Sequence, residues 1–215
     1  MWGGSPVDNY CERLGPGLWA EPLNALTNLA FIVAAWLIWR LASRRDALSG
    51  RVQLLVVLVA TVGVGSGLFH TFANTLTLWL DVIPILVFQL VFLWLYFRDL
   101  IGMSSTFAAG ALFAFLATAL GGEFLPGVLN GSLTYAPALI VLVILGVYHY
   151  RRNKTERALM LLAAGVFFAS LVFRTVDAAI CPYASFGTHF LWHLMNAALL
   201  YLVSRAYVLN VHSVH

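Results

Sequence analysis

Two histidines, His189 and His193, stand four residues apart in the apolar run "GTHFLWHLMNAALLYLV", residues 187–203. A helix places residues at this spacing one above the other on a single face. Two imidazoles on one helical face can bind the same metal ion. The alternative is that these histidines form hydrogen bonds to neighbouring helices, which is the common role of a lone histidine in an apolar helix.

The upstream segment "GVGSGLFHTFANTLTLWLDVIPI" contains residues that could complete a metal site. His70 is the candidate third ligand, because three protein nitrogens and a water form a common catalytic zinc sphere. Ser66 lies one helical turn before His70, on the same face. Asp81 begins the next helix and could orient or deprotonate a water at the metal. The combined set predicts a zinc site at which Asp81 could act on a metal-bound water, with Ser66 on the same face as His70.

The elements that must position these residues are membrane helices. Hydrophobic residues make up 61% of the 215 residues and charged residues 10%, whereas soluble domains have about 25% charged residues. Apolar runs of roughly 18 residues or more indicate transmembrane helices, and their continuity excludes a β-barrel. We expect an all-α, polytopic membrane protein, a seven-transmembrane helix bundle. The expected helices cover about residues 22–41, 52–74, 79–97, 104–121, 133–149, 157–178 and 187–206.

The basic residues predict the orientation of the bundle. All of the lysines and arginines except Arg13 and Arg174 lie on one side of these helices. Cytoplasmic loops are rich in lysine and arginine, so we expect the N-terminus outside and the C-terminus in the cytoplasm. The formal charge of +3 therefore reflects topology and not nucleic-acid binding. This orientation brings the histidines, Ser66 and Asp81 to one depth near the outer face, where clustered polar residues usually mark a site.

We expect a single domain over residues 1–215. Residues 1–21 would form an extracytoplasmic segment that caps the bundle, residues 22–206 the bundle and residues 207–215 a cytoplasmic tail. The capping segment offers oxygen ligands of the kind that calcium prefers, although the same residue types also cap helices and form turns. These candidate calcium ligands are Asp8, Asn9, Glu12 and Glu21.

Other polar residues leave alternatives open. Cys11 and Cys181 both lie on the outer side, where a disulfide is expected, with two free thiols as the alternative. Arg174 and Asp177 are three residues apart on one helix and could form an internal salt bridge or act in catalysis. The remaining histidines are expected to be interfacial or solvated, without a role in the site. They are His149, His212 and His215.

Three ordered segments resemble the alkaline ceramidases, a family within the superfamily that includes progestin/adiponectin-receptor-like proteins. The segment "CER…WAEPLNALTN" resembles the family's Cys-Glu followed by Glu-x-x-Asn-x-x-Ser/Thr-Asn. "GVGSGLFHTFANTLTLWLDVIPI" resembles its Gly-x-Gly-Ser-x-x-x-His block, with the aspartate eleven residues after the histidine. "THFLWHL" resembles its His-x-x-x-His block. At two positions the chain departs from the family's pattern, with Asn9 in place of aspartate and Leu14 in place of asparagine.

The resemblance implies a zinc-dependent intramembrane hydrolase of lipid amides. It would cleave the N-acyl amide of ceramide or a related N-acyl lipid to a fatty acid and an amine. The alternative is a seven-transmembrane lipid receptor or sensor with a structural zinc site. The compact chain suggests a bacterial inner membrane protein with its site near the periplasmic face. The implied zinc ligands are His70, His189 and His193, with Asp81 as the general base and Ser66 as the residue that stabilises the oxyanion. The resemblance also implies a calcium site at Glu12, Glu21 and a residue near Asn9, and a disulfide between Cys11 and Cys181.

Overall fold

The computed structural model describes residues 5–15, 17–122, 124 and 128–211, and this part of the chain is all-α. Its α-helices are α1 Pro22–Thr27, α2 Leu29–Arg44, α3 Gly50–Phe72, α4 Thr75–Leu95, α5 Ser105–Gly122, α6 Ala136–Arg151, α7 Leu159–Ile180 and α8 His189–Asn210. A π-helical turn, Tyr96–Ile101, extends α4, and a 3-10 segment, Val128–Tyr135, precedes α6. Each of the seven long helices, α2 to α8, overlaps one of the seven expected segments.

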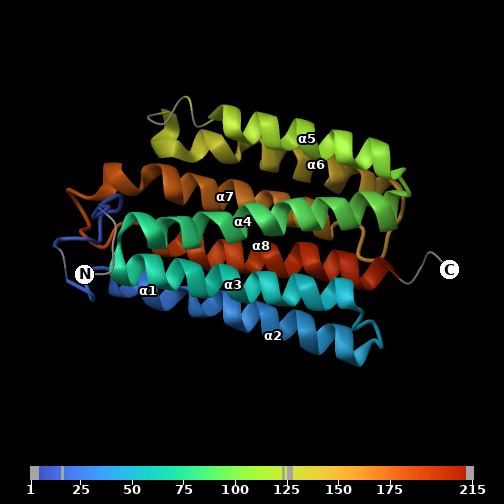
Figure 1. Cartoon of the computed structure of the whole chain (residues 1–215), viewed down its shortest axis with the longest axis horizontal. Coiled ribbons are helices and arrows are strands. Elements are labelled where there is room, and N and C mark those ends of the chain that lie inside the picture. The colour runs from blue at the N-terminus through green and yellow to red at the C-terminus, as the bar shows by residue number, and fades with distance from the viewer. Residues whose placement is uncertain (1–4, 16, 123, 125–127, 212–215) are drawn as a thin grey trace.

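The long helices run roughly parallel in one bundle (Figure 1). The N-terminal segment and the loop between α7 and α8 lie at one end, and the C-terminal end of α8 lies at the other. Helix α8 packs against α2 and α7, while α3 packs against both α2 and α4. The first expected helix is interrupted at Asn28, so it consists of the short helix α1 followed by α2. This break presents α1 beside the end of the bundle that carries the histidines.

Within the described residues, six helical stretches are long and apolar enough to cross a membrane. They are Pro22–Arg44, Gly50–Phe72, Thr75–Ile101, Ser105–Gly122, Val128–Arg151 and Leu159–Ile180. Helix α8, which covers the seventh expected span, is long enough but is not among them by composition. The physical reason is that much of α8 lies inside the bundle, where its polar residues pack against protein and need not face lipid. Asn210, for example, is buried and forms hydrogen bonds with Thr155 and Ala206.

Large apolar side chains are exposed on the outside of the bundle. Phe107, Phe113 and Phe168 are examples, and other exposed leucines, isoleucines and valines accompany them on most helices. Exposed apolar area on this scale would cause aggregation in water, whereas lipid accommodates it. Together with the six apolar stretches, this surface identifies an integral membrane protein.

A tight turn joins α3 to α4 and holds the N-terminal segment. Ala73 ends α3 in the left-handed conformation, and Asn74 begins α4 with a reciprocal capping box to Thr77. The backbone N–H of Val7 donates to the carbonyl of Ala73 at 2.9 Å, and Pro6 bridges to Asn74. The turn therefore fixes both the start of α4 and the path of the chain above it.

At the opposite end of the bundle, one sequence expectation is wrong. His149 is neither interfacial nor solvated, because it is fully buried in α6 and its Nδ1 lies 2.8 Å from the hydroxyl of Tyr96. The backbone carbonyl of Thr155 lies 3.2 Å from its Nε2. His149 thus joins α6 to the π-helical turn and the following loop. His212 and His215 lie outside the described residues.

Candidate metal centre

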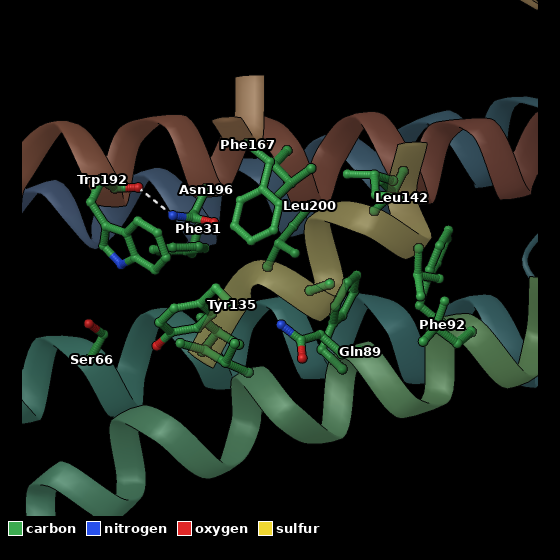
Figure 2. Close-up of a pocket in the computed structure, with 18 of the residues that line it drawn as sticks. Phe31, Ser66, Gln89, Phe92, Tyr135, Leu142, Phe167, Trp192, Asn196 and Leu200 are labelled. Carbon is green, nitrogen blue, oxygen red and sulfur yellow. Dashed lines mark hydrogen bonds between the residues drawn. The ribbon is translucent and has the colours of Figure 1, made fainter. Parts of the chain in front are cut away.

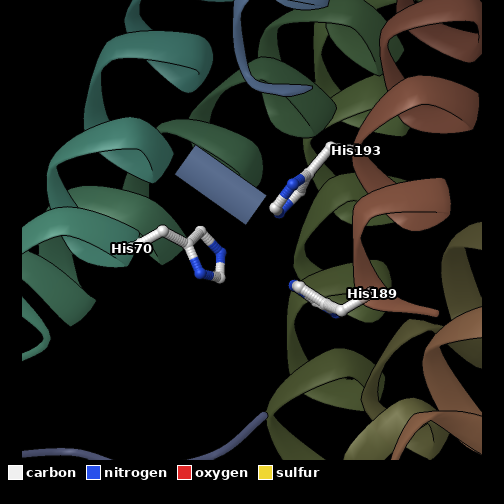
Figure 3. Close-up of side chains that lie close together, drawn as sticks. All are labelled: His70, His189 and His193. Atoms are coloured by element: carbon white, nitrogen blue, oxygen red, sulfur yellow. The ribbon is translucent and has the colours of Figure 1, made fainter. Parts of the chain in front are cut away.

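The structure brings the three candidate ligands together in the bundle. His70 comes from the last turn of α3, and His189 and His193 come from the first turns of α8 (Figure 3). One ring nitrogen from each lies within 4.8 Å of the others, and all three side chains are buried. The His70 and His193 ring centroids are 4.7 Å apart, as are those of His189 and His193. In the described part of the chain, this is the one such cluster of histidine, cysteine or carboxylate ligands.

A close approach of α3 and α4 sets the position of the two candidate catalytic residues. A Cβ at Gly65 would lie 1.9 Å from the carbonyl oxygen of Leu80, so only glycine allows the two backbones to meet there. Ser66 follows Gly65, and Asp81 follows Leu80, so the contact brings these two side chains together. Both residues are buried, and both line the same pocket as His193.

Asp177 of α7 fixes the start of α8. Its Oδ1 accepts the backbone N–H of Thr188 at 2.6 Å and that of His189 at 3.0 Å. The backbone N–H of Cys11 donates to its Oδ2 at 3.1 Å. Unpaired N–H groups at a helix N-terminus favour such a carboxylate. Asp177 is therefore a helix cap that orients the first histidine.

Arg174 does not pair with Asp177. Its guanidinium donates to the carbonyl of Asn130 at 2.6 Å and to the hydroxyl of Ser132 at 3.0 Å. It also lies over the rings of Tyr135 and Trp192. Of the two roles left open by the sequence, the internal salt bridge is therefore wrong, and Arg174 joins the 3-10 segment to the bundle.

The hydrogen bond to Glu21 determines which nitrogen of His70 faces the cluster. Nδ1 of His70 lies 2.5 Å from Oε2 of Glu21. Burial raises the pKa of the Glu21 carboxyl, but hydrogen bonds from His70, Arg13 and Asn24 outweigh burial and hold its pKa below the ordinary value. A carboxylate oxygen accepts hydrogen bonds, so Nδ1 of His70 is the donor to Glu21, and Nε2 is the nitrogen that faces the cluster. That Nε2 is buried without a hydrogen-bond partner.

Thr27 has the same effect on His193. Its hydroxyl donates to the carbonyl of Leu23 at 2.7 Å and lies 3.0 Å from Nδ1 of His193. The single hydroxyl proton is used at Leu23, so the oxygen accepts from Nδ1–H of His193. The lone pair of His193 is then on Nε2. Second-shell partners of this kind orient histidine ligands in metal sites and fix their tautomer.

His189 is held by stacking. The ring of Tyr10 stacks on it with centroids 3.7 Å apart, and burial raises the pKa of the Tyr10 phenol above its ordinary value. Nδ1 of His189 is buried without a hydrogen-bond partner. Buried polar atoms are nearly always paired, so two orphaned ring nitrogens in one cluster, together with the lone pair of His193, fit a metal ion. An all-nitrogen set of three histidines suits zinc.

His193 also lines a largely apolar pocket inside the bundle, and Figure 2 shows part of its wall. Side chains from both halves of the chain line it, from Phe31 and Val62 to Leu200 and Val203. Ser66, Asp81 and His193 form its polar end. Most of the remaining wall is apolar, with Gln89 and Asn196 as polar exceptions along it. The lining extends along α8 to Val203, ten residues beyond His193 and therefore about 15 Å away.

The N-terminal segment is fastened over the cluster. The expected disulfide between Cys11 and Cys181 is confirmed, with the two Cα atoms 5.2 Å apart. Glu12 accepts the backbone N–H groups of Leu23 and Asn24 at 2.7 and 2.8 Å, so it caps α1.

The residues expected to hold calcium do not fit that ion here. Both oxygens of Glu12 are used at α1, and both oxygens of Glu21 are used by His70 and Arg13. Asp8 and Asn9 are exposed. Calcium takes about six to eight oxygen ligands, and this arrangement does not offer them.

Sequence reasoning missed the roles of Glu21, Thr27, Asp177 and Arg13. The segment "EPLNALTN" does contain a pattern that indicates the roles of Glu21 and Thr27, because Glu21, Asn24 and Thr27 stand three residues apart. This spacing puts polar residues on one face of a helix, opposite the apolar face. That face points to the histidines. The roles of Asp177 and Arg13 depend on contacts between distant segments, and no spacing in the sequence indicates them.

The fold and the cluster define the class of protein: a membrane-embedded helical bundle with a buried three-histidine site at the polar end of an apolar pocket. A family model described as Ceramidase matches residues 8–213, nearly the whole chain. The chain therefore belongs to the ceramidase family, which implies an amidohydrolase with a lipid substrate. No curated protein matches the sequence.

Proposed function

We propose that this protein is a zinc-dependent hydrolase that cleaves the amide of ceramide or a related N-acyl lipid into a fatty acid and an amine. The observation that carries this proposal is the position of the three histidines. Two of their ring nitrogens are buried and unpaired, and the cluster lies where an apolar pocket meets Asp81 and Ser66. Family membership supports the same reaction class.

His70, His189 and His193 would hold the zinc ion. Zinc in such a site supplies a Lewis acid for the amide carbonyl and makes a nearby water more acidic. Glu21 and Thr27 keep the metal-facing nitrogens of His70 and His193 free of protons. These hydrogen bonds would fix the orientation of two of the three ligands in the metal-free protein.

Asp81 serves as general base and then as general acid. Its carboxylate accepts a proton from the attacking water as the water oxygen bonds to the amide carbon. When the carbon–nitrogen bond breaks, Asp81 returns the proton to the leaving amine, so the fatty acid and the free amine account for all atoms. Ser66, which lines the pocket together with Asp81, donates a hydrogen bond from its hydroxyl to the developing oxyanion.

The apolar pocket would hold the acyl chain. Phe31, Phe88 and Leu142 are among the residues along its wall, and burial of each methylene in such a wall contributes about 0.8 kcal/mol. The polar end holds the amide, so the chain extends from there into the bundle. This arrangement lets a lipid present its linkage without leaving the membrane.

We place the cluster at the outer face of the membrane. The loops that contain most of the basic residues lie at the end away from the histidines (Figure 1), and such loops favour the cytoplasm. The N-terminus is then outside and the C-terminus inside. In a bacterial inner membrane, the site would face the periplasm, where a disulfide such as Cys11–Cys181 persists.

The test is hydrolysis of a panel of N-acyl lipids by the purified full chain, followed by mass spectrometry of the products. Ceramides, N-acyl amino acids and ornithine-type lipids belong on the panel. We expect a fatty acid and an amine from at least one of them, and no products with His193→Ala. His149→Ala removes a buried histidine at the other end of the bundle and should retain hydrolysis. Tight lipid binding without any product would instead support a receptor.

A further inference from the structure

The side chain of Arg13 extends from the capping segment toward the metal centre. Its Nε donates to Oε1 of Glu21 at 2.5 Å, and its Nη2 donates to the backbone carbonyl of His70 at 3.1 Å. Its Nη1 donates to the carbonyl of Gly15 at 3.2 Å. The Arg13 side chain is only 7% exposed and that of Glu21 only 1%. One guanidinium therefore joins a buried carboxylate, the backbone of a metal ligand and its own loop.

Two features of this location require a positive charge. The Glu21 carboxyl is buried and lies within hydrogen-bond distance of the guanidinium, and a buried charge without a partner is strongly destabilising. The carbonyl of His70 belongs to the last turn of α3, where carbonyl groups lack helical partners and the helix dipole is negative. The planar guanidinium donates hydrogen bonds to both acceptors, the Glu21 carboxyl and the His70 carbonyl.

The family resemblance implies a calcium ion near these same carboxylates. Of the two departures from the family's pattern, Leu14 has no side-chain oxygen, and Asn9 has a neutral amide in place of a carboxylate. Of the remaining candidates, the oxygens of Glu12 and Glu21 are already paired within the protein. Among the described residues, two buried amide oxygens have no partner, Oδ1 of Asn24 and Oδ1 of Asn28, and calcium takes about six to eight oxygen ligands. The positive charge of Arg13 would also repel a divalent cation at this place.

We propose that Arg13 is a built-in cation in the place of bound calcium. It is a positioning residue: it holds Glu21 against Nδ1 of His70, and through Glu21 it sets the orientation of a zinc ligand. The protein then needs zinc but not calcium. This inference rests on the proposed function only in taking zinc as the ion at the histidines, and its tests do not require substrate.

The first test is a calcium titration of purified, zinc-loaded protein, followed by calorimetry and by the thermal unfolding midpoint. We expect no binding heat and no change in the midpoint up to roughly 1–10 mM calcium, above the dissociation constants of weak extracellular sites. Stoichiometric calcium binding that raises the midpoint would overturn the proposal. It would leave the hydrolase proposal intact, because that proposal does not depend on calcium.

The second test compares Arg13→Gln with Arg13→Lys and with a matched control, Arg51→Gln. Arg51 forms an ion pair with Asp99 at the far end of the bundle. We expect Arg13→Gln to weaken zinc binding about 10–100-fold, as losses of second-shell partners do, and to alter the visible absorption spectrum of cobalt-substituted protein. Arg13→Lys should recover part of the affinity, and Arg51→Gln should match wild type.

Wild-type zinc affinity and an unchanged cobalt spectrum in Arg13→Gln would show that Arg13 does not position His70. If this variant does not fold, the calcium titration of the wild-type protein decides the proposal. Zinc affinity and cobalt absorption are both measured without lipid, so a failure to find hydrolysis leaves this test standing.

Discussion

The carboxylate of Glu21, just before α1, and the imidazole of His70, at the end of α3, meet at 2.5 Å between Oε2 and Nδ1. These residues are 49 positions apart in the chain. The contact joins the capping segment to the metal centre and leaves Nε2 of His70 free to bind an ion. A carboxylate behind a histidine ligand also makes the ring a better donor to metal.

Glu21→Gln should lower zinc affinity by about 10–100-fold. The amide cannot carry the negative charge that draws the His70 proton to Nδ1, and it leaves Arg13 without its ionised partner. The dissociation constant can be measured by competition with a coloured chelator. Glu156→Gln is the control, because Glu156 pairs with Arg205 far from the histidines. Equal zinc affinity in wild type and Glu21→Gln would contradict this role.

Thr27→Val should weaken zinc binding less than Glu21→Gln does. The change keeps the shape of the side chain but removes the hydroxyl that accepts Nδ1–H of His193, leaving a buried donor unpaired at a cost of about 1–3 kcal/mol. Thr27→Ser retains the hydroxyl and should restore most of the affinity. The role assigned to the hydroxyl is wrong if the serine and valine variants bind zinc equally well.

Asp81→Asn should retain zinc and lose turnover. Asp81 is not part of the three-histidine ligand cluster, so the metal content should stay close to that of wild type. An amide cannot accept the proton of the attacking water, and general-base catalysis contributes about 10²–10⁴-fold. Metal analysis and initial rates on the same preparation separate the two effects. Loss of zinc together with activity would make Asp81 a ligand rather than a base.

Gly187→Ala should destabilise the fold by about 1–3 kcal/mol. Gly187 has φ of +60°, and a Cβ there would lie 2.2 Å from Oδ1 of Asp177 and 2.6 Å from Cβ of Cys11. The substitution therefore strains the cap of α8 and the disulfide together. Gly110→Ala in α5 is the control, because nothing lies within 4 Å of its Cβ position. Thermal unfolding in detergent compares the two, and equal midpoints would argue against a strained cap.

Much of the bundle could be predicted from apolar runs alone, because a membrane helix needs a continuous stretch of fixed length. The histidine cluster was predictable for a related reason. Helical spacing pairs His189 with His193, and alternation of the helices across the bundle brings His70 to the same end. The composition of α8 differs because this helix faces protein, and hydropathy measures only how well a segment suits lipid.

The partners behind the ligands could not be predicted in the same way. Glu21 and Glu12 have the residue types of a calcium site, and only the folded chain shows that their oxygens face Arg13, His70 and the start of α1. The spacing would allow Asp177 to pair with Arg174, but its carboxylate instead accepts hydrogen bonds from the backbone N–H groups at the start of α8. His149 is polar by type but finds a partner in Tyr96 inside the bundle.

We propose that amide hydrolysis requires a zinc ion held by the three histidines. The most direct measurement removes metal from the purified protein, returns zinc in steps and follows fatty-acid release by mass spectrometry at each zinc occupancy. We predict no release without zinc, a rise in proportion to bound zinc up to one ion per chain, and no recovery in His193→Ala. Full hydrolysis by the metal-free protein would contradict the account.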